Sequence, residues 1–186
     1  MDGSSKFFIK AIEEAKIVEQ NALREEFIPS KKISFECEET GSNISIIPDE
    51  KYRIDTKIDF NTKVLGTQTA SIKNISDFKN EISSARTFSF LHELETLLEH
   101  GLIKGGDLNN AIVYVDKPLA NSNMDRLKKA FNKDSISVTP NGILDNLSLH
   151  YPNEAARHKL LDVIGDLALI GMKIRGKVIA EKPGHT

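Results

Sequence analysis

The spacing of apolar residues changes near residue 30. Between residues 7 and 21 apolar side chains recur every three or four positions, which predicts an amphipathic helix over 7–21 capped by Ser4 or Ser5. Residues 22–32 mix charges with Pro29 and show no period, which is typical of a connector and indicates a boundary near Ser30. Beyond it, apolar and polar residues alternate, so the chain changes from helix to sheet.

The alternating segments predict half-buried antiparallel strands at 33–37, 44–47, 52–60 and 64–72. Gly41 and Ser42 provide a turn between the first two strands. Cys37 shares the apolar side of its strand with Phe35, which favours a buried, inert thiol over a nucleophile. Ser76 is predicted to cap a short helix that ends at Ile82.

The second half of the chain is richer in helical patterns. Helices are predicted at 91–100, ended by Gly101, at 123–131, and at 153–170, opened by Pro152 and Asn153 and closed by Gly171. Short strands are predicted at 111–115 and 177–180. Strands that cluster early and helices that cluster late predict an α+β fold, with a mostly antiparallel sheet and helices on one face.

Composition narrows the class of protein. The 186 residues carry 25 Lys and Arg against 27 Asp and Glu, a net charge of −2, and no basic stripe, which argues against nucleic-acid binding. No apolar run is long enough for a transmembrane segment and no signal peptide is apparent, so we expect a cytoplasmic protein. One cysteine excludes an internal disulfide framework and a Cys-rich zinc finger.

The helix predicted at 153–170 carries a stripe of ionisable residues. His158, Asp162 and Asp166 are spaced by four residues and lie at about 0°, 40° and 80° on the helix wheel, while apolar residues occupy most of the remaining circumference. The pattern predicts a largely buried helix with one polar edge. An imidazole and a carboxylate one turn apart can bind one Zn²⁺, and Lys159 beside them can hold an anionic part of a ligand.

Alternatives to a zinc site stay open at this point. A His and an Asp at i and i+4 also form ordinary structural pairs, worth a few tenths of a kcal/mol. His185 would add another imidazole, but a chain end is more often simply a tail.

Four segments together resemble a known family. The helix motif HKxxDxxGD (158–166), the motifs ARTF (85–88) and PGH (183–185), and the Asp-Gly-Ser start of the chain closely resemble the UDP-3-O-acyl-N-acetylglucosamine deacetylases of lipid A biosynthesis. The segment 116–143 resembles the form of this enzyme that is fused to a hydroxyacyl-ACP dehydratase domain.

The resemblance implies half of a two-domain deacetylase fold. Residues 1–28 would be the last helix of the first deacetylase domain and its linker. Residues 29–186 would be the second domain, a two-layer sandwich with an inserted βαβ element within 91–115 that walls the acyl-chain passage. The family's upstream HxEHL-like motif, with a third zinc ligand and a general base, would precede residue 1. We therefore expect an incomplete fragment that is inactive alone.

The resemblance also implies roles for individual residues. His158 and Asp162 would bind Zn²⁺. Lys159 and Phe88 would contact the substrate, UDP-3-O-(3-hydroxyacyl)-N-acetylglucosamine, and Thr87 would donate a hydrogen bond to the oxyanion. Asp166 would keep His185 protonated as a general acid. The first deacetylase domain and a fused dehydratase domain are the protein partners implied. The alternative is a non-catalytic binding module with a structural His-Asp pair.

Overall fold

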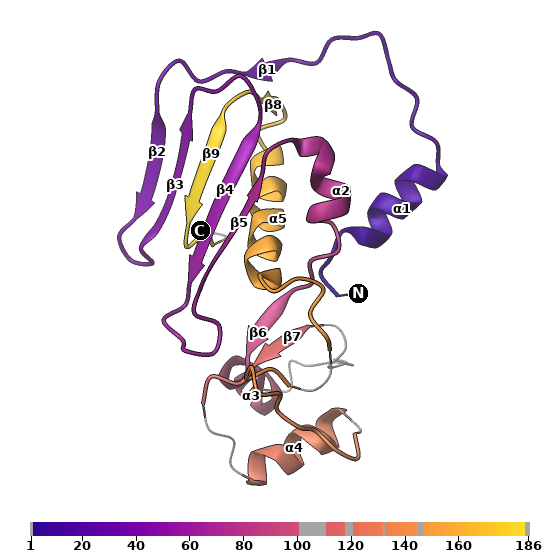
Figure 1. Ribbon diagram of the computed structural model, residues 1–186, viewed down its shortest axis with the longest axis vertical. Coiled ribbons are helices and arrows are strands. Elements are labelled where there is room, and N and C mark those ends of the chain that lie inside the picture. The colour runs from indigo at the N-terminus through magenta and orange to yellow at the C-terminus, as the bar shows by residue number, and fades with distance from the viewer. Residues whose placement is uncertain (1, 101–110, 118–120, 132, 145–146, 185–186) are drawn as a thin grey trace.

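A five-stranded sheet covered on one face by a long helix forms the main body of the protein (Figure 1). This computed structural model describes residues 2–100, 111–117, 121–131, 133–144 and 147–184. The covering helix, α5 (Glu154–Ala168), packs against strands β4 and β5. The predicted α+β fold is confirmed.

The last strand of the chain lies in the middle of this sheet. The order is β2-β3-β9-β4-β5, and every neighbouring pair is antiparallel except β4 and β9, which are parallel. Gly41, with a φ of 68°, makes the predicted turn between β2 and β3. The strands are β2 (Ile33–Cys37), β3 (Ser42–Ile47), β4 (Arg53–Asp59), β5 (Thr67–Ile72) and β9 (Lys177–Glu181).

The predicted alternation of apolar and polar residues over 52–60 gives β4 one buried face, and α5 packs against β4. Ile54, Thr56 and Ile58 of β4 are buried, while Arg53, which precedes them, and Lys57, which lies between the last two, are exposed. On α5, Leu160 is fully buried and Val163 nearly so, in the same core as the β4 isoleucines. Each fully buried aliphatic side chain contributes about 1.5–3 kcal/mol to folding. This packing holds α5, and the residues it carries, against the sheet.

A smaller body lies beyond one end of the sheet (Figure 1). Parallel strands β6 (Phe88–Phe90) and β7 (Ile112–Tyr114), with α3 (Leu91–Glu99) between them in sequence, confirm the expected βαβ element, although it begins at Phe88 and so starts before the expected range of 91–115. Gly101 lies outside the described residues. Among the described helices, none has the length and apolar character needed to cross a membrane. The remaining elements are α1 (Lys6–Glu14), β1 (Glu26–Phe27), a 3₁₀ turn (Ile75–Asp77), α2 (Phe78–Glu81), α4 (Asn121–Phe131) and β8 (Lys173–Ile174).

The predicted helix over 7–21 is too long. Helix α1 ends at Glu14, and Lys16 follows with a φ of 59°, which breaks the helical path. Val18 is 82% exposed and Leu23 is 99% exposed, so the apolar stripe beyond Glu14 packs on nothing within the described part of the chain. The apolar side chains within α1 are exposed as well, with Phe8 60% exposed, so the left-handed backbone at Lys16 and not a loss of packing marks the end of the helix.

The predicted serine caps are also wrong. Ser5 stands at the N-cap of α1, but its hydroxyl donates to the Ser83 carbonyl instead of capping, and the Ser4 hydroxyl donates to Asp2. Ser76 lies inside the 3₁₀ turn rather than before it.

Strand β2 is paired as predicted but is not half-buried. Ile33 and Phe35 are 47% and 59% exposed, and Cys37 is partly exposed rather than buried. The reason is position, because β2 is an edge strand and α5 covers the other side of the sheet at β4 and β5. Alternation identified the strand but could not show which strands the helix would cover.

Candidate functional site

Five of the residues singled out from the sequence line one hollow. Thr87 precedes β6 and Phe88 begins it, whereas His158, Lys159 and Asp162 project from α5. The hollow has a volume of about 250 Å³, and its remaining lining residues are Phe60, Phe90 and Glu93. The fold therefore brings together two segments that are about 70 residues apart in the sequence.

His158 is held so that one ring nitrogen stays available. The residue is 7% exposed, and its Nδ1 lies 3.2 Å from the Ala85 carbonyl oxygen. A carbonyl can only accept a hydrogen bond, so Nδ1 carries a proton, and in the neutral imidazole Nε2 then carries the lone pair. Backbone carbonyls that accept a hydrogen bond from one ring nitrogen orient metal-binding histidines in the same way. Nε2 is the atom on the side of Asp162.

Asp162 completes a donor pair of the kind Zn²⁺ binds. Its Oδ1 lies 3.6 Å from His158 Nε2, and its Oδ2 accepts a hydrogen bond from Lys159 Nζ at 3.1 Å. Two ligands on a tetrahedral zinc ion are separated by about 3.4 Å, given Zn–N and Zn–O bonds of about 2.0–2.2 Å. The pair therefore fits as two zinc ligands. Within the described ranges, no three His, Cys, Asp or Glu side chains gather in metal-binding geometry.

Aromatic rings form one wall of the hollow. The Phe60 ring meets those of Phe88 and Phe90 edge to face, with centroids 5.4 and 5.5 Å apart. Apolar rings make the surroundings of the His-Asp pair less polar, and a lower local dielectric strengthens electrostatic interactions. Phe60 and Phe90 were not singled out from the sequence, since an apolar residue near a strand end is ordinary.

Asp166 lies apart from this hollow. It lines a different depression with Val163, Leu167 and Gly184, beside the end of β9. It is exposed, as are most residues of the last turn of α5, so the prediction of a largely buried helix is wrong for that part. The buried residues of α5 all lie between Glu154 and Val163, so the sheet covers only the first turns of that helix. His185, which follows Gly184, lies outside the described residues.

Gly3, which belongs to the Asp-Gly-Ser start but was not singled out as a site residue, packs against the site. A Cβ on Gly3 would lie only 2.8 Å from the Thr87 Cβ and 3.3 Å from His158 Cε1, and the φ of Gly3 is 73°. The Thr87 N–H donates to the Asp2 carbonyl, and Asp2 Oδ1 accepts bonds from Ser4. The turn formed by residues 2–4 is therefore packed against two of the residues that line the hollow, Thr87 and His158.

Arg86 and Glu154 form a buried ion pair behind the hollow. Glu154 is fully buried, and Arg86 Nε donates to its Oε1 at 2.8 Å. Burial acts to raise the pKa of Glu154, but the Arg86 hydrogen bonds and charge outweigh burial and hold the pKa below its usual value. Glu154 precedes His158 by four residues, so it extends the ionisable stripe by one turn.

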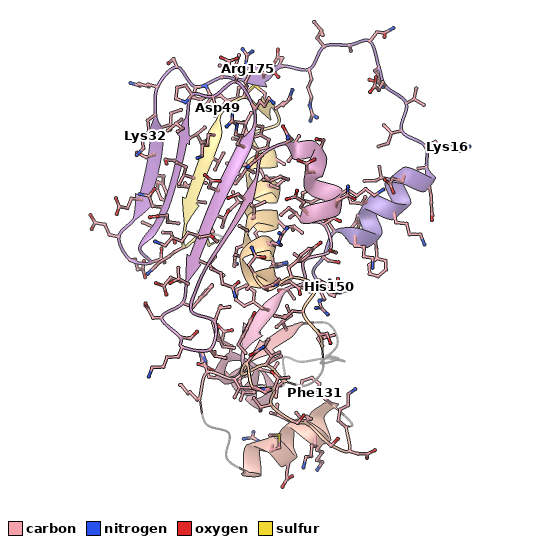
Figure 2. The ribbon with its side chains drawn as sticks, viewed as in Figure 1. Lys16, Lys32, Asp49, Phe131, His150 and Arg175 are labelled. Carbon is pink, nitrogen blue, oxygen red and sulfur yellow. The ribbon has the colours of Figure 1, made fainter. Side chains whose placement is uncertain are left out.

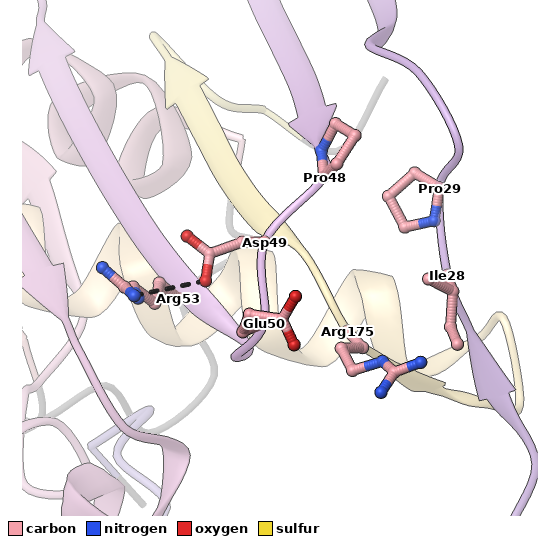
Figure 3. Close-up of a pocket in the computed structure, with 7 residues that line it drawn as sticks. All are labelled: Ile28, Pro29, Pro48, Asp49, Glu50, Arg53 and Arg175. Carbon is pink, nitrogen blue, oxygen red and sulfur yellow. Dashed lines mark ion pairs between the residues drawn. The ribbon is translucent and has the colours of Figure 1, made fainter.

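A second hollow, at the opposite end of the sheet, has no His-Asp pair among the residues that line it. Figure 3 shows its lining, and Figure 2 shows Asp49 and Arg175 at that end of the molecule, away from His150. Asp49 pairs with Arg53 at 3.3 Å, and Arg175 pairs with Glu26 at 3.5 Å, so these charges offset one another. The lining residues are Ile28, Pro29, Pro48, Asp49, Glu50, Arg53 and Arg175.

Comparison with known proteins agrees with the geometry. The model of the LpxC family, UDP-3-O-acyl N-acetylglycosamine deacetylase, matches residues 1–136 and 122–186. The chain belongs to the LpxC family. This confirms the resemblance, and the segments on both sides of the hollow fall within the match.

Relatives of the LpxC family show how much of the protein this chain represents. It is 41% identical to the bifunctional enzyme LpxC/FabZ of Bacteroides thetaiotaomicron and 44% identical to that of Porphyromonas gingivalis, over the whole chain and 40% of each relative. It is 34% identical to the UDP-3-O-acyl-N-acetylglucosamine deacetylase of Nitratidesulfovibrio vulgaris, over 52% of that protein. The chain thus spans about two-fifths to one-half of these LpxC relatives.

Proposed function

We propose that this chain contributes one half of the active site of a deacetylase in lipid A biosynthesis. The reaction is hydrolysis of the N-acetyl group of UDP-3-O-(3-hydroxyacyl)-N-acetylglucosamine. The observation that carries the proposal is the hollow lined by Thr87, Phe88, His158, Lys159 and Asp162. Its polar groups match the needs of amide hydrolysis, and the chain belongs to a deacetylase family.

His158 Nε2 and Asp162 Oδ1 would hold Zn²⁺. A bound zinc ion supplies Lewis acidity and lowers the pKa of a bound water to about 7. The Ala85 carbonyl keeps the His158 ring in the tautomer this role needs. Lys159 Nζ bonds the second Asp162 oxygen, which holds the carboxylate in place and leaves a cation beside the hollow. That cation would contact the diphosphate or sugar of the substrate.

Thr87 would stabilise the negative charge that develops on the amide oxygen. Its hydroxyl belongs to a residue fixed on both sides, because Thr87 N–H donates to Asp2 and Ile112 N–H donates to the Thr87 carbonyl. Fixed donors need no reorganisation during reaction, and removing one typically costs about 2.7–4 kcal/mol of barrier. Thr87→Val should therefore lower kcat by about 10²–10³-fold. Phe88 would lie beside the substrate.

Further groups are needed to complete the site. Asp166 would hold the His185 imidazole protonated, ready to give a proton to the leaving amine. A third zinc ligand and a general base would come from the first deacetylase domain, to which residues 1–28 would belong as its last helix and linker. A fused hydroxyacyl-ACP dehydratase domain is the other proposed partner.

A chimeric enzyme tests the proposal. The segment of the B. thetaiotaomicron LpxC/FabZ enzyme that matches this chain is replaced by residues 1–186, and acetate release from the substrate is measured. We expect activity that His158→Ala abolishes. His100→Ala is the matched control, because His100 is an exposed imidazole whose Nδ1 forms a hydrogen bond with the Thr96 carbonyl of its own helix. Full activity of the His158→Ala chimera would show that the His-Asp pair is merely structural.

Calorimetry on the 186-residue chain tests the metal separately. Two ligands on one helix should bind Zn²⁺ weakly, and Asp162→Asn should weaken binding further. The chain alone should not turn over, since it would lack the base and the third ligand. Tight stoichiometric zinc binding by a chain whose His185 imidazole has been removed would contradict this division of the site. Turnover of the substrate by the 186-residue chain alone would also contradict it.

A further inference from the structure

Three consecutive residues of the ARTF segment each form a backbone hydrogen bond with a different residue. The Ala85 carbonyl accepts a bond from His158 Nδ1, the Arg86 N–H donates to Glu154 Oε1 at 3.1 Å, and the Thr87 N–H donates to Asp2. Two of these three bonds reach α5, at positions one helical turn apart. The start of α5 is thus joined directly to the backbone that precedes Thr87.

Glu154 uses both carboxylate oxygens fully. Oε1 accepts from the Arg86 backbone N–H and from Arg86 Nε, while Oε2 accepts from Arg86 Nη2 at 3.1 Å and from the His150 N–H. Arg86 Nη2 also donates to the Ser148 carbonyl at 2.7 Å. The guanidinium and the carboxylate meet as a bidentate fork, the most orientation-specific ion pair available to proteins.

Stability alone is a poor reason for such a pair. Removing two charges from water costs so much that replacing a buried ion pair by apolar residues is often neutral or stabilising. What the pair provides is a defined separation between the two elements it joins. Those elements carry Thr87 and His158, and Gly3 packs against both side chains.

We propose that Arg86 and Glu154 are positioning residues that set Thr87 relative to His158. The inference rests on the proposed function for its catalytic meaning, but the geometry it concerns exists without metal or substrate. Neither residue lines the hollow among the described residues, so both act through their neighbours.

The test uses the zinc-free chain and nuclear Overhauser contacts. In the wild type, the Gly3 α-protons should show contacts to the Thr87 methyl group and to the His158 Hε1 proton. Glu154→Gln replaces one acceptor oxygen by an NH₂ group, so two donors face a donor whichever way the amide turns. We expect these contacts to lose at least half their intensity, while contacts between β4 and β5 stay unchanged.

Ile72→Ala is the control, because it removes a buried side chain from β5 without touching the ion pair. It should lower stability yet leave the Gly3 contacts intact. If Glu154→Gln fails to fold, the same contacts are measured in Arg86→Lys. Lysine keeps the positive charge but cannot form the bidentate pair with the Glu154 carboxylate. Unchanged Gly3 contacts in the folded ion-pair variant, or an equal loss in Ile72→Ala, would overturn the inference.

Zinc affinity separates this inference from the proposed function. His158 and Asp162 both lie on α5, so Glu154→Gln should change the zinc dissociation constant by less than about threefold, which corresponds to about 0.65 kcal/mol. A larger loss would mean that the pair supports α5 itself and would overturn the inference. A wild-type chain that binds no zinc at all would refute the proposed function and leave the Overhauser test unaffected.

Discussion

Replacing Gly3 by alanine tests whether the turn at residues 2–4 is packed tightly against Thr87 and His158 of the site. Two penalties add. The φ of 73° is a left-handed conformation that costs an L-residue about 1–2 kcal/mol. The new Cβ would also meet Thr87 Cβ at 2.8 Å, and overpacking of this kind costs about 1–3 kcal/mol. Gly3→Ala should therefore lower the free energy of unfolding by about 2–5 kcal/mol.

Gly41→Ala is a matched control for the first penalty. Gly41 has a φ of 68°, but no atom lies within 4 Å of the Cβ that alanine would add. Its cost should be about 1–2 kcal/mol, from backbone conformation alone. Urea unfolding of both variants measures the difference, which isolates the contact of residue 3 with Thr87 and His158. If Gly3→Ala cost no more than Gly41→Ala, the turn would not be packed against the site.

Two further predictions concern titratable groups. Because the pKa of Glu154 is lowered in the folded protein, its contribution to stability is fully present above the usual pKa of 4.5 and is lost as the pH falls through the folded value. Urea unfolding between pH 3 and 7 should show this decline in the wild type and a shallower one in Glu154→Gln; equal slopes would contradict it. The hydrogen bond from Thr40 lowers the pKa of Cys37, so this partly exposed thiol should react with iodoacetamide in the native protein, and Thr40→Val should slow it. Protection of Cys37 until unfolding would show instead that β2 is covered.

Local patterns were sufficient for most elements of the fold. Alternation located β4 because one face of that strand is buried, and the four-residue spacing placed His158 and Asp162 on one edge of α5. The spacing of apolar residues alone could not show where a predicted helix ends or which strands are buried. Helix α1 stops at Glu14 because the backbone turns at Lys16, and β2 stays exposed at the sheet edge.

The site was predictable only as far as the resemblance reached. His158, Lys159 and Asp162 are close in sequence, but the approach of Thr87 to them depends on contacts between distant segments. Arg86 and Glu154 are 68 positions apart, and no local period connects them. A glutamate one turn before the His-Asp pair was the single available signal, and its meaning required the burial that only tertiary structure gives.

The central place of β9 has a consequence for synthesis on the ribosome. Its two neighbours, β3 and β4, are complete long before it, since β5 ends at Ile72 and β9 at Glu181. At about 5–20 residues per second, the nascent chain waits roughly 5–20 s with a gap between two hairpins. During that interval both inner strand edges are open to pairing with other chains. Slow translation of the later segments would therefore favour aggregation, and chaperone capture would be most useful in that interval.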